Sequence, residues 1–117
     1  MRIAIVGSRN YSDLERVREY VRSLPTGTVV VSGGAIGVDK AAEFQARRCG
    51  LEVEIFIPEW NVYGKSAGFR RNKQIVDAAD EVTAFWDGRS KGTLSTIHLA
   101  REAGKPVNII LLRPNEE

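Results

Sequence analysis

Five short, mostly apolar runs divide the chain at regular intervals. They are rich in β-branched side chains and span residues 3–6, 28–31, 53–57, 82–85 and 107–112. Nearly continuous apolar runs of this length are typical of strands that are covered on both faces of a sheet. We therefore predict five buried strands.

The segments between these runs indicate helices. In two of them, apolar positions recur at the spacing of one helical face. These positions are Leu14, Val17, Val21 and Leu24 in the first segment, and Val38, Ala41, Ala42 and Cys49 in the second. Two more helices are predicted over residues 67–79 and 93–103. Gly50 and Gly104 stand where the second and fourth helices should end.

Two local predictions follow from the helical segments. Ser12 and Glu15 have the spacing of a capping box, in which each side chain bonds the backbone of the other at the start of the first helix. Cys49 lies on the alanine-rich face of the second helix and is expected to be a small buried apolar group.

Strands and helices alternate throughout, which predicts an α/β fold with right-handed crossovers. We expect a Rossmann-like three-layer α/β/α domain with a five-stranded, mainly parallel sheet in the order 3-2-1-4-5. A length of 117 residues suits one hydrophobic core. Residues 1–113 are therefore predicted to form a single domain, and residues 114–117 a loose tail.

Composition restricts the partners and the cellular compartment. The net charge of +2 is too small for a general nucleic-acid or membrane binder, so a positive field would have to be local. No apolar run approaches the length of a membrane span. Cys49 is the single cysteine, which favours the cytoplasm and leaves no cysteine-based metal site. His98 has no second histidine beside it, so we expect no metal and no cofactor.

Glycines gather behind the predicted strands. Eight of the 11 follow the first four strands: Gly7, Gly33, Gly34, Gly37, Gly64, Gly68, Gly88 and Gly92. In a parallel sheet these loops share the carboxyl edge, where ligands bind. Glycine lets a ligand approach the backbone, and the next helix offers free N–H groups and a positive dipole end, so a phosphate is the expected ligand. The alternative is that these glycines serve packing in tight turns.

Two of these loops are the best candidate phosphate-binding loops, residues 32–37 and 87–93. The Walker A pattern fails at Glu59, where it needs glycine, and the dinucleotide fingerprint is absent after Gly7. A standard nicotinamide dehydrogenase is therefore not expected.

Several side chains are candidates for the same edge. Arg9 and Arg71 are expected to bind phosphate oxygens. For Arg70, the neighbour of Arg71 on the helix, the sequence favours a place in the site and a place on the surface equally. Asn72 could bond a ribose or base, or have a capping or surface role. Asp39 could favour the dipole of the second helix, bind a sugar hydroxyl or hold a neighbouring loop in place.

Other side chains near this edge leave their role open. Asp87 is the one candidate general base. Trp60, Tyr63 and Trp86 are candidates for stacking on a base or for packing.

Four motifs follow one another through nearly the whole chain. They are Gly7-Ser8-Arg9, the segment from Ser32 to Asp39, the segment from Tyr63 to Gly68 with Arg71-Asn72, and Ser90-Lys91-Gly92-Thr93. As a set they resemble the SLOG superfamily, which joins the DNA-processing protein DprA with the LOG phosphoribohydrolases, and the likeness is closest to its small stand-alone YspA-like branch. The resemblance implies a Rossmann-like fold and recognition of nucleotides or nucleotide-derived ligands.

The motifs depart from the LOG enzymes at one position. Thr96 stands where the LOG pattern has its catalytic glutamate. A threonine cannot readily act as a general base near neutral pH or stabilise a cationic transition state. The likeness to DprA lies in Gly7-Ser8-Arg9 and in Asp39 with the two residues before it. DprA binds single-stranded DNA with a larger, more basic surface than this chain offers.

The leading hypothesis is therefore binding of a nucleotide, phosphoribosyl or ADP-ribose-like ligand. Its predicted contacts are Gly7, Ser8, Arg9, Ser32, Gly33, Gly34, Gly37, Asp39, Arg71, Asn72, Ser90, Gly92 and Thr93. The alternatives are a LOG-like phosphoribohydrolase acting on nucleoside monophosphates, and DprA-like binding of single-stranded DNA. The alanine-rich helices offer contact faces for a homo-oligomer.

Overall fold

The structure is a computed structural model that describes residues 1–114. Of the loose tail predicted for residues 114–117, all but Pro114 lies outside the described residues. Among residues 1–114, no helix has both the length and the apolar character needed to cross a membrane.

A five-stranded parallel sheet forms the centre of the molecule, in the order β3-β2-β1-β4-β5. This confirms the predicted fold class and strand order. The strands are β1 (Arg2–Gly7), β2 (Val29–Ser32), β3 (Glu52–Ile55), β4 (Glu81–Trp86) and β5 (Val107–Leu111). The chain order reverses direction between β1 and β4, which places a topological switch point at the carboxyl ends of these two strands.

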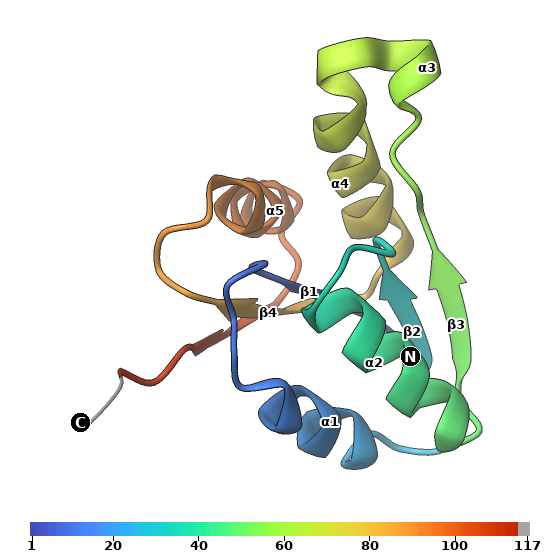
Figure 1. Ribbon diagram of the computed structural model, residues 1–117. Helices are drawn as coiled ribbons and strands as arrows, with labels where there is room; N and C mark the ends of the chain where they lie inside the picture. The colour runs from blue at the N-terminus through green and yellow to red at the C-terminus, as the bar shows by residue number, and fades with distance from the viewer. Residues whose placement is uncertain (115–117) are drawn as a thin grey trace.

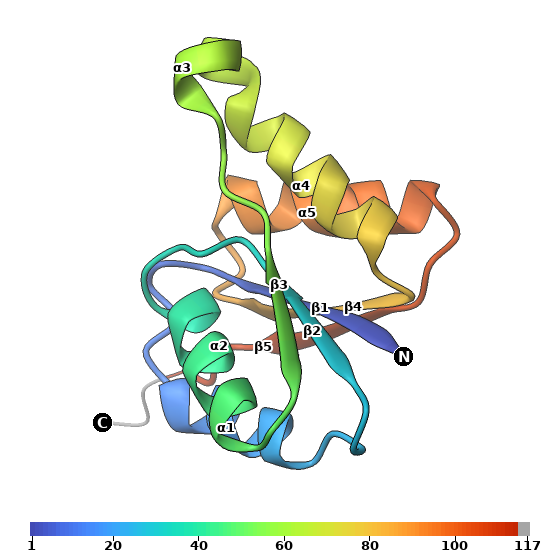
Figure 2. The same cartoon turned by 90° about the vertical axis from the view of Figure 1, so that its right-hand side faces the viewer.

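Helices cover both faces of the sheet (Figure 1). One layer holds α1 (Leu14–Arg22) and α2 (Val38–Arg48), and the other holds α4 (Ala67–Ala78) and α5 (Lys91–Glu102). Between β3 and α4 the chain forms α3 (Trp60–Tyr63) and a 3₁₀ turn (Gly64–Ser66). This short segment stands out from the body of the molecule together with the start of α4 (Figure 2).

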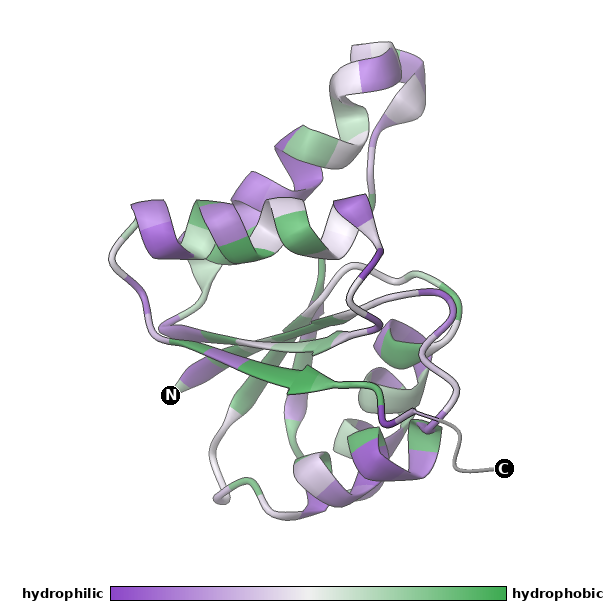
Figure 3. Ribbon diagram, turned by 90° about the vertical axis from the view of Figure 1, so that its left-hand side faces the viewer, coloured by the Kyte–Doolittle hydropathy of each residue, from purple (hydrophilic) through white to green (hydrophobic). Residues whose placement is uncertain are grey.

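Each face of the sheet has its own core. The α1–α2 side is built around Tyr11, Val17, Val21 and Phe85, and the α4–α5 side around aliphatic residues. Apolar colour follows the strands and the inward helix faces, while the outer helix faces are polar (Figure 3). This is the pattern expected when strands are buried between two helix layers.

Gly7 fixes how closely the end of β1 approaches α2. A Cβ at this position would lie 2.5 Å from the side chain of Val38, the first residue of α2. Only a residue without a side chain permits this contact. The close packing holds the loop after β1 beside the loop that precedes α2, and so brings two of the motif segments together.

Three details differ from the sequence-based predictions. Asp13, and not Ser12, caps α1, because its carboxylate accepts the backbone N–H of Arg16. Cys49 is exposed at the end of α2 and is not a buried apolar group. The helix α3 was not predicted, since a single turn shows no helical periodicity.

Candidate functional site

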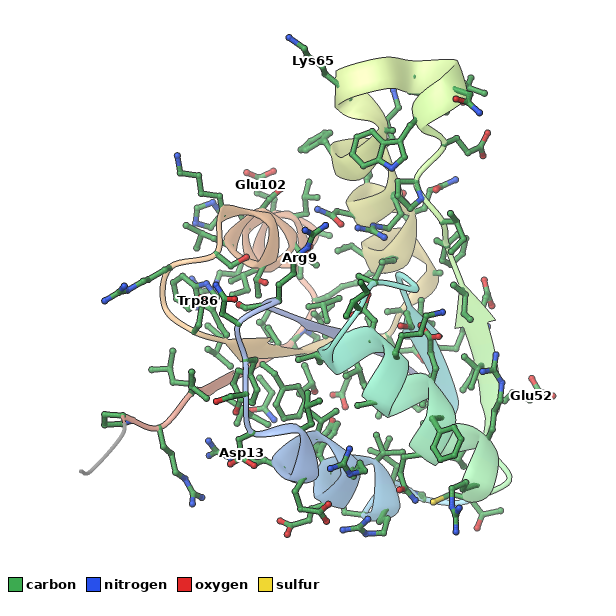
Figure 4. All side chains as sticks on the ribbon, in the orientation of Figure 1. Arg9, Asp13, Glu52, Lys65, Trp86 and Glu102 are labelled. Carbon is green, nitrogen blue, oxygen red and sulfur yellow. The ribbon has the colours of Figure 1, made fainter. Side chains whose placement is uncertain are left out.

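A cleft of about 550 Å³ opens at the carboxyl ends of β1 and β4. Its wall comes from the loop after β1, the loop before α2, the inner face of α4 and the start of α5. Arg9 rises from the loop after β1 into the space between α4 and α5 (Figure 4). Three arginines and two aspartates line the cleft: Arg9, Arg71, Arg89, Asp39 and Asp87.

The loop of residues 32–37 is held from behind by a buried glutamate. Glu43, which is only 2% exposed, accepts the hydroxyl of Ser32 at 2.7 Å and the backbone N–H of Gly34 at 3.1 Å. Lys40 lies 3.5 Å from the same carboxylate. The N–H of Gly34, one of the predicted phosphate donors, is therefore bound to the protein's own carboxylate.

Asp39 occupies the front of the same loop and faces Arg71. Its carboxylate accepts the backbone N–H of Ala35 at 3.1 Å. Burial raises the pKa of Asp39 to about 6, although the N–H of Ala35 and the charge of Arg71 oppose the shift. Glu43 adds to the increase by its negative charge. The cleft wall thus contains a carboxyl group that titrates close to neutral pH.

Arg71 is fixed in the cleft from α4. Its Nη1 donates to the carbonyl of Gly33 at 2.7 Å, and its Nε donates to the side chain of Asn72 at 3.0 Å. A Cβ on Gly33 would lie 2.6 Å from the Arg71 guanidinium and 2.9 Å from the Asp39 carboxylate. Gly33 therefore leaves the space that the Arg71 guanidinium and the Asp39 carboxylate occupy beside the loop.

The loop of residues 87–93 is organised by its own aspartate. Asp87 accepts the backbone N–H groups of Ser90 at 2.8 Å and of Arg89 at 2.9 Å, and the hydroxyl of Ser8 at 3.2 Å. The N–H groups of Ser90 and Arg89 together lower the pKa of Asp87. A carboxylate stabilised in its charged form is a poor general base at neutral pH, so these contacts favour a structural role for Asp87.

The start of α5 faces the cleft. Ser90 caps this helix and accepts the N–H of Thr93 at 3.4 Å, while the Thr93 hydroxyl lies 3.3 Å from that of Ser8. Gly92, in the first turn, lines the cleft and would leave open space around an added Cβ. The positive end of the α5 dipole is consequently open to an anion.

The predicted contact residues fall into two groups. Those that line the cleft are Gly7, Arg9, Asp39, Arg71, Asn72, Ser90, Gly92 and Thr93. Those that lie behind or beside its wall are Ser8, Ser32, Gly33, Gly34 and Gly37. The topology thus brings the first, second and fourth motifs to one site, together with Arg71 and Asn72 of the third, whose segment from Tyr63 to Gly68 does not line the cleft. The second group supports the wall rather than forming it.

Arg70 and the candidate stacking residues lie away from the cleft wall. Arg70 turns outward and its guanidinium lies 4.4 Å from the ring centre of Tyr63. Trp60 is within 3.4 Å of the Cβ position of Gly68, and Trp86 donates to the carbonyl of Ser90 at 3.1 Å. Trp60 and Tyr63 are exposed, at 57% and 44%, and none of the three aromatic residues lines the cleft.

Two contributors to the site were missed from the sequence. Asn10 lines the cleft beside Arg9 and follows it directly in the same loop. Glu43 lies four residues after Asp39, so the two carboxylates share one face of α2. That spacing was visible in the sequence, but the burial that makes Glu43 a support of the loop was not.

The chemistry available in the cleft is anion binding and hydrogen bonding. Thr96 lines the cleft and is only 2% exposed. Its hydroxyl donates to the carbonyl of Gly92 at 3.3 Å. Within residues 1–114, no group of three or more histidine, cysteine, aspartate or glutamate side chains is placed to hold a metal ion.

Comparisons with known proteins identify a family and one close relative in sequence. The family model of DNA recombination-mediator protein A matches residues 1–60. The gene 61 protein of Mycobacterium phage D29 is 40% identical over 116 residues, covering 91% of this chain and 93% of that protein.

Solved structures of DprA share the fold. DprA from Streptococcus pneumoniae has a TM-score of 0.80 and 26% identity over 92% of this chain, which spans 49% of that DprA chain. DprA from Helicobacter pylori, whose structure concerns its binding of single-stranded DNA, has a TM-score of 0.74 and 23% identity, covering 100% of this chain and 67% of that one. The chain belongs to the DNA recombination-mediator protein A family, within the SLOG superfamily whose motifs it carries.

Proposed function

We propose that the cleft binds the phosphate group of a nucleotide or a nucleotide-derived ligand. The observation that carries this proposal is the position of Arg9, Arg71 and Arg89 around the open N-terminus of α5. Guanidinium groups bind phosphate oxygens in pairs, and a helix N-terminus adds N–H donors and a positive dipole. The volume of about 550 Å³ lies within the range of small-molecule sites.

The geometry supports binding by side chains more than by glycine-rich backbone. The N–H groups of Gly34, Ala35, Arg89 and Ser90 are bonded to Glu43, Asp39 and Asp87. The arginines and the first turn of α5 line the cleft as further donors, although Nη1 and Nε of Arg71 are already bonded to Gly33 and Asn72. Asn10 and Asn72 line the same space and suit the hydroxyl or amide edges of a sugar or base.

Single-stranded DNA is the second candidate ligand, and a specific surface favours it. A groove between α4 and α5 is lined by Phe69, Lys91 and Leu94, and Lys91 directly precedes the cleft residue Gly92. Phe69 is 54% exposed, as a side chain that stacks on a base must be. The H. pylori DprA relative binds single-stranded DNA. In this second candidate the cleft would hold one phosphate of the strand.

The nucleotide proposal is tested by calorimetry with AMP, ADP-ribose, NAD and a short oligodeoxythymidine. We expect binding of at least one ligand with a Kd below 1 mM, on the order of typical metabolite affinities. Arg71→Gln should weaken it by about tenfold or more, because a charge-assisted phosphate contact is lost. Arg47→Gln, at an exposed position near the far end of α2, is the matched control and should bind like the wild type.

The two candidate functions differ in how the affinity depends on the length of the ligand. A mononucleotide site predicts equal affinity for a mononucleotide and for an oligonucleotide that carries it. A surface that binds single-stranded DNA predicts an affinity that rises with strand length. That affinity should fall when Phe69→Ala removes the stacking surface. No binding of any of the four ligands at millimolar concentration would contradict both.

Hydrolysis of the N-glycosidic bond receives less support from the geometry. Thr96 replaces the expected glutamate and bonds the Gly92 carbonyl, and Asp87 is engaged by backbone N–H groups. Release of adenine from AMP by the wild-type protein would revive this alternative.

Two broader proposals complete the functional picture. We propose that the chain works in the cytoplasm, where the exposed thiol of Cys49 stays reduced. We also propose that it associates with copies of itself.

A further inference from the structure

The segment between β3 and α4 exposes several apolar side chains close together. This segment, the arm, comprises residues 57–66. Of the nine large apolar side chains that are exposed among the described residues, four lie within seven consecutive positions of the arm: Ile57, Trp60, Val62 and Tyr63. Across residues 60–66, all of which the structure describes, no residue is buried. Exposed apolar surface that is concentrated in this way marks a site of interaction with a protein or a membrane.

Polar contacts hold the arm in an ordered shape. The hydroxyl of Ser66 donates to the carbonyl of Tyr63 at 3.0 Å, and Nε of Arg70 donates to the hydroxyl of Ser66 at 3.1 Å. The backbone N–H groups of Val62 and Tyr63 both donate to the carbonyl of Glu59 at 3.0 Å. The apolar side chains are therefore presented by a preformed turn, so binding does not have to order it first.

The arm protrudes, and its aromatic rings lie on two sides of it. It stands away from the body of the molecule together with the start of α4 (Figure 2). The ring of Trp60 reaches within 3.4 Å of the Cβ position of Gly68, whereas the ring centre of Tyr63 lies 4.4 Å from the guanidinium of Arg70. Positions 68 and 70 are about 200° apart around a helix axis, so the rings flank the start of α4 on roughly opposite sides.

This arrangement favours a lipid surface over a protein surface. A flat protein face could cover only one side of the protrusion and would leave the ring on the other side in water. The headgroup layer of a membrane surrounds an inserted protrusion on every side. Trp and Tyr are enriched at this layer because their rings combine an apolar body with a polar edge.

The charges of the arm suit an anionic membrane. Lys65 and Arg70 lie beside the apolar side chains, and Glu59 is the single carboxylate within residues 57–70. Lys65 points away from the body of the molecule at the outer end of the arm (Figure 4). Neither cation forms an ion pair with a carboxylate of residues 1–114. Both are therefore free to bind lipid phosphates, and the cytoplasmic leaflet of a membrane carries negative charge.

We propose that the arm inserts into the headgroup layer of an anionic lipid bilayer. Trp60, Val62 and Tyr63 enter the boundary between headgroups and acyl chains, while Lys65 and Arg70 bind the lipid phosphates. The contact lies on the membrane surface and does not span it.

The arm and the cleft are separate sites at the same edge of the sheet. The arm follows the carboxyl end of β3, and the cleft opens at the carboxyl ends of β1 and β4. None of the cleft-lining residues within the described chain belongs to the arm. A molecule bound through the arm would hold its cleft close to the bilayer, with the cleft free to take its own ligand.

Sedimentation with lipid vesicles tests the proposal. The vesicles are phosphatidylcholine with about 30% phosphatidylglycerol or with none, at an ionic strength of about 0.15 M, where exposed charges act over only about 8 Å. The wild type should bind the anionic vesicles about tenfold or more tightly than the neutral ones, because each of the two cations contributes about a fivefold gain.

Variants of the arm should weaken binding to the anionic vesicles. Trp60→Ala and Val62→Asp should each weaken it by about tenfold or more, because each removes apolar surface from the bilayer. Phe44→Ala, at an exposed aromatic residue of α2, is the matched control and should bind like the wild type. Lys65→Gln should weaken binding by about fivefold, and its control Arg47→Gln should not. Circular dichroism checks that every variant is folded.

Tryptophan fluorescence reports whether the arm itself enters the lipid. The chain has two tryptophans, so Trp86→Phe leaves Trp60 as the single reporter. Its emission should shift to shorter wavelength when anionic vesicles are added, because the ring leaves water. Trp60→Phe leaves Trp86 as the reporter, and its emission should not shift.

Three results would overturn the proposal. The first is a wild type that stays in solution with both kinds of vesicle. The second is an equal loss of binding in Lys65→Gln and Arg47→Gln, which would indicate attraction by the overall charge. The third is a shift of the Trp60 emission with a short oligodeoxythymidine and none with vesicles, which would assign the arm to nucleic acid. Binding of AMP to the cleft, measured separately, should be the same in Trp60→Ala as in the wild type.

Discussion

The two glycine-rich loops of the cleft have similar composition, but the aspartates bonded to them have pKa values shifted in opposite directions. The loop of residues 32–37 is bonded to two buried carboxylates of α2, Asp39 and Glu43, and burial raises the pKa of Asp39. The loop of residues 87–93 is bonded to its own Asp87, near the surface, where backbone N–H groups lower the pKa of that carboxyl. In the first loop, burial therefore disfavours the charged form of Asp39. In the second loop, hydrogen bonds stabilise the charged form of Asp87.

This difference assigns different tasks to the loops. The first positions Arg71 through the carbonyl of Gly33, and its N–H groups face the protein. The second presents the start of α5 to the cleft. A glycine-rich loop at the carboxyl edge of a sheet is thus not by itself a phosphate cradle, because the protein's own carboxylates can occupy the same donors.

Truncating the carboxylate of each loop should give the largest contrast. Glu43→Ala leaves the Ser32 hydroxyl and the Gly34 N–H without their buried acceptor, so we expect a loss of about 3 kcal/mol in unfolding free energy. Asp87→Ala, at a site that water reaches, should cost about 1 kcal/mol. Chemical denaturation measures both. Equal costs would show that the two loops are supported alike.

Adding a side chain to one glycine in each loop gives the next effect. Gly33→Val would displace the Arg71 guanidinium and the Asp39 carboxylate, and we expect about 2 kcal/mol of destabilisation with loss of phosphate affinity. Gly92→Ala meets no atom within 4 Å and should change stability by less than about 0.5 kcal/mol. Thermal unfolding with calorimetric titration follows both properties. A destabilised Gly92→Ala would contradict the open space at that position.

The raised pKa of Asp39 predicts that anion affinity depends on pH. Above about pH 6 the carboxylate is charged and opposes an anion in the cleft, whereas below that pH it is protonated and neutral. Sulfate, whose own charge stays constant in this range, should bind about fivefold more tightly at pH 5.5 than at pH 8, on the order of a screened charge contact. Arg71 and Glu43 are the charged groups that act on Asp39 in the fold.

Two variants identify the group responsible. Asp39→Asn should bind sulfate equally at both pH values, near the affinity that the wild type reaches at low pH. His98→Gln, at an exposed position on α5, should keep the wild-type dependence. Loss of the dependence in His98→Gln alone would assign it to the histidine.

The cap of α5 should give the smallest effect. Ser90→Ala removes the acceptor for the Thr93 N–H, and the long distance of 3.4 Å predicts a cost of about 0.5 kcal/mol. Ser90→Asp should retain the stability, because a carboxylate also caps a helix. A cost above about 2 kcal/mol for Ser90→Ala would mean that the cap supports the whole loop.

Topology could be predicted from the sequence because each strand is marked by a continuous apolar run and two of the helices by the spacing of their apolar residues. That signal also brought Arg9, Arg71 and Gly92 to one edge, since parallel strands share their carboxyl ends. The bond from Asp39 to the loop was one of the roles that the sequence left open for it. The bonds from Glu43 could not be predicted, because they depend on which helix face is buried. The choice of Asp13 over Ser12 as the cap is likewise decided by local geometry that two adjacent polar residues leave open.

Backbone amide chemical shifts during titration with AMP test the central claim most directly. If the arginines and α5 bind the phosphate, the largest changes should fall on Arg9, Asn10 and Gly92 and on the Arg71 side chain, while the N–H groups of Gly34 and Ala35 remain bonded to Glu43 and Asp39 and change little. The largest changes at Gly34 and Ala35, with Arg9 and Gly92 unaffected, would contradict this assignment and return the phosphate to the loop before α2.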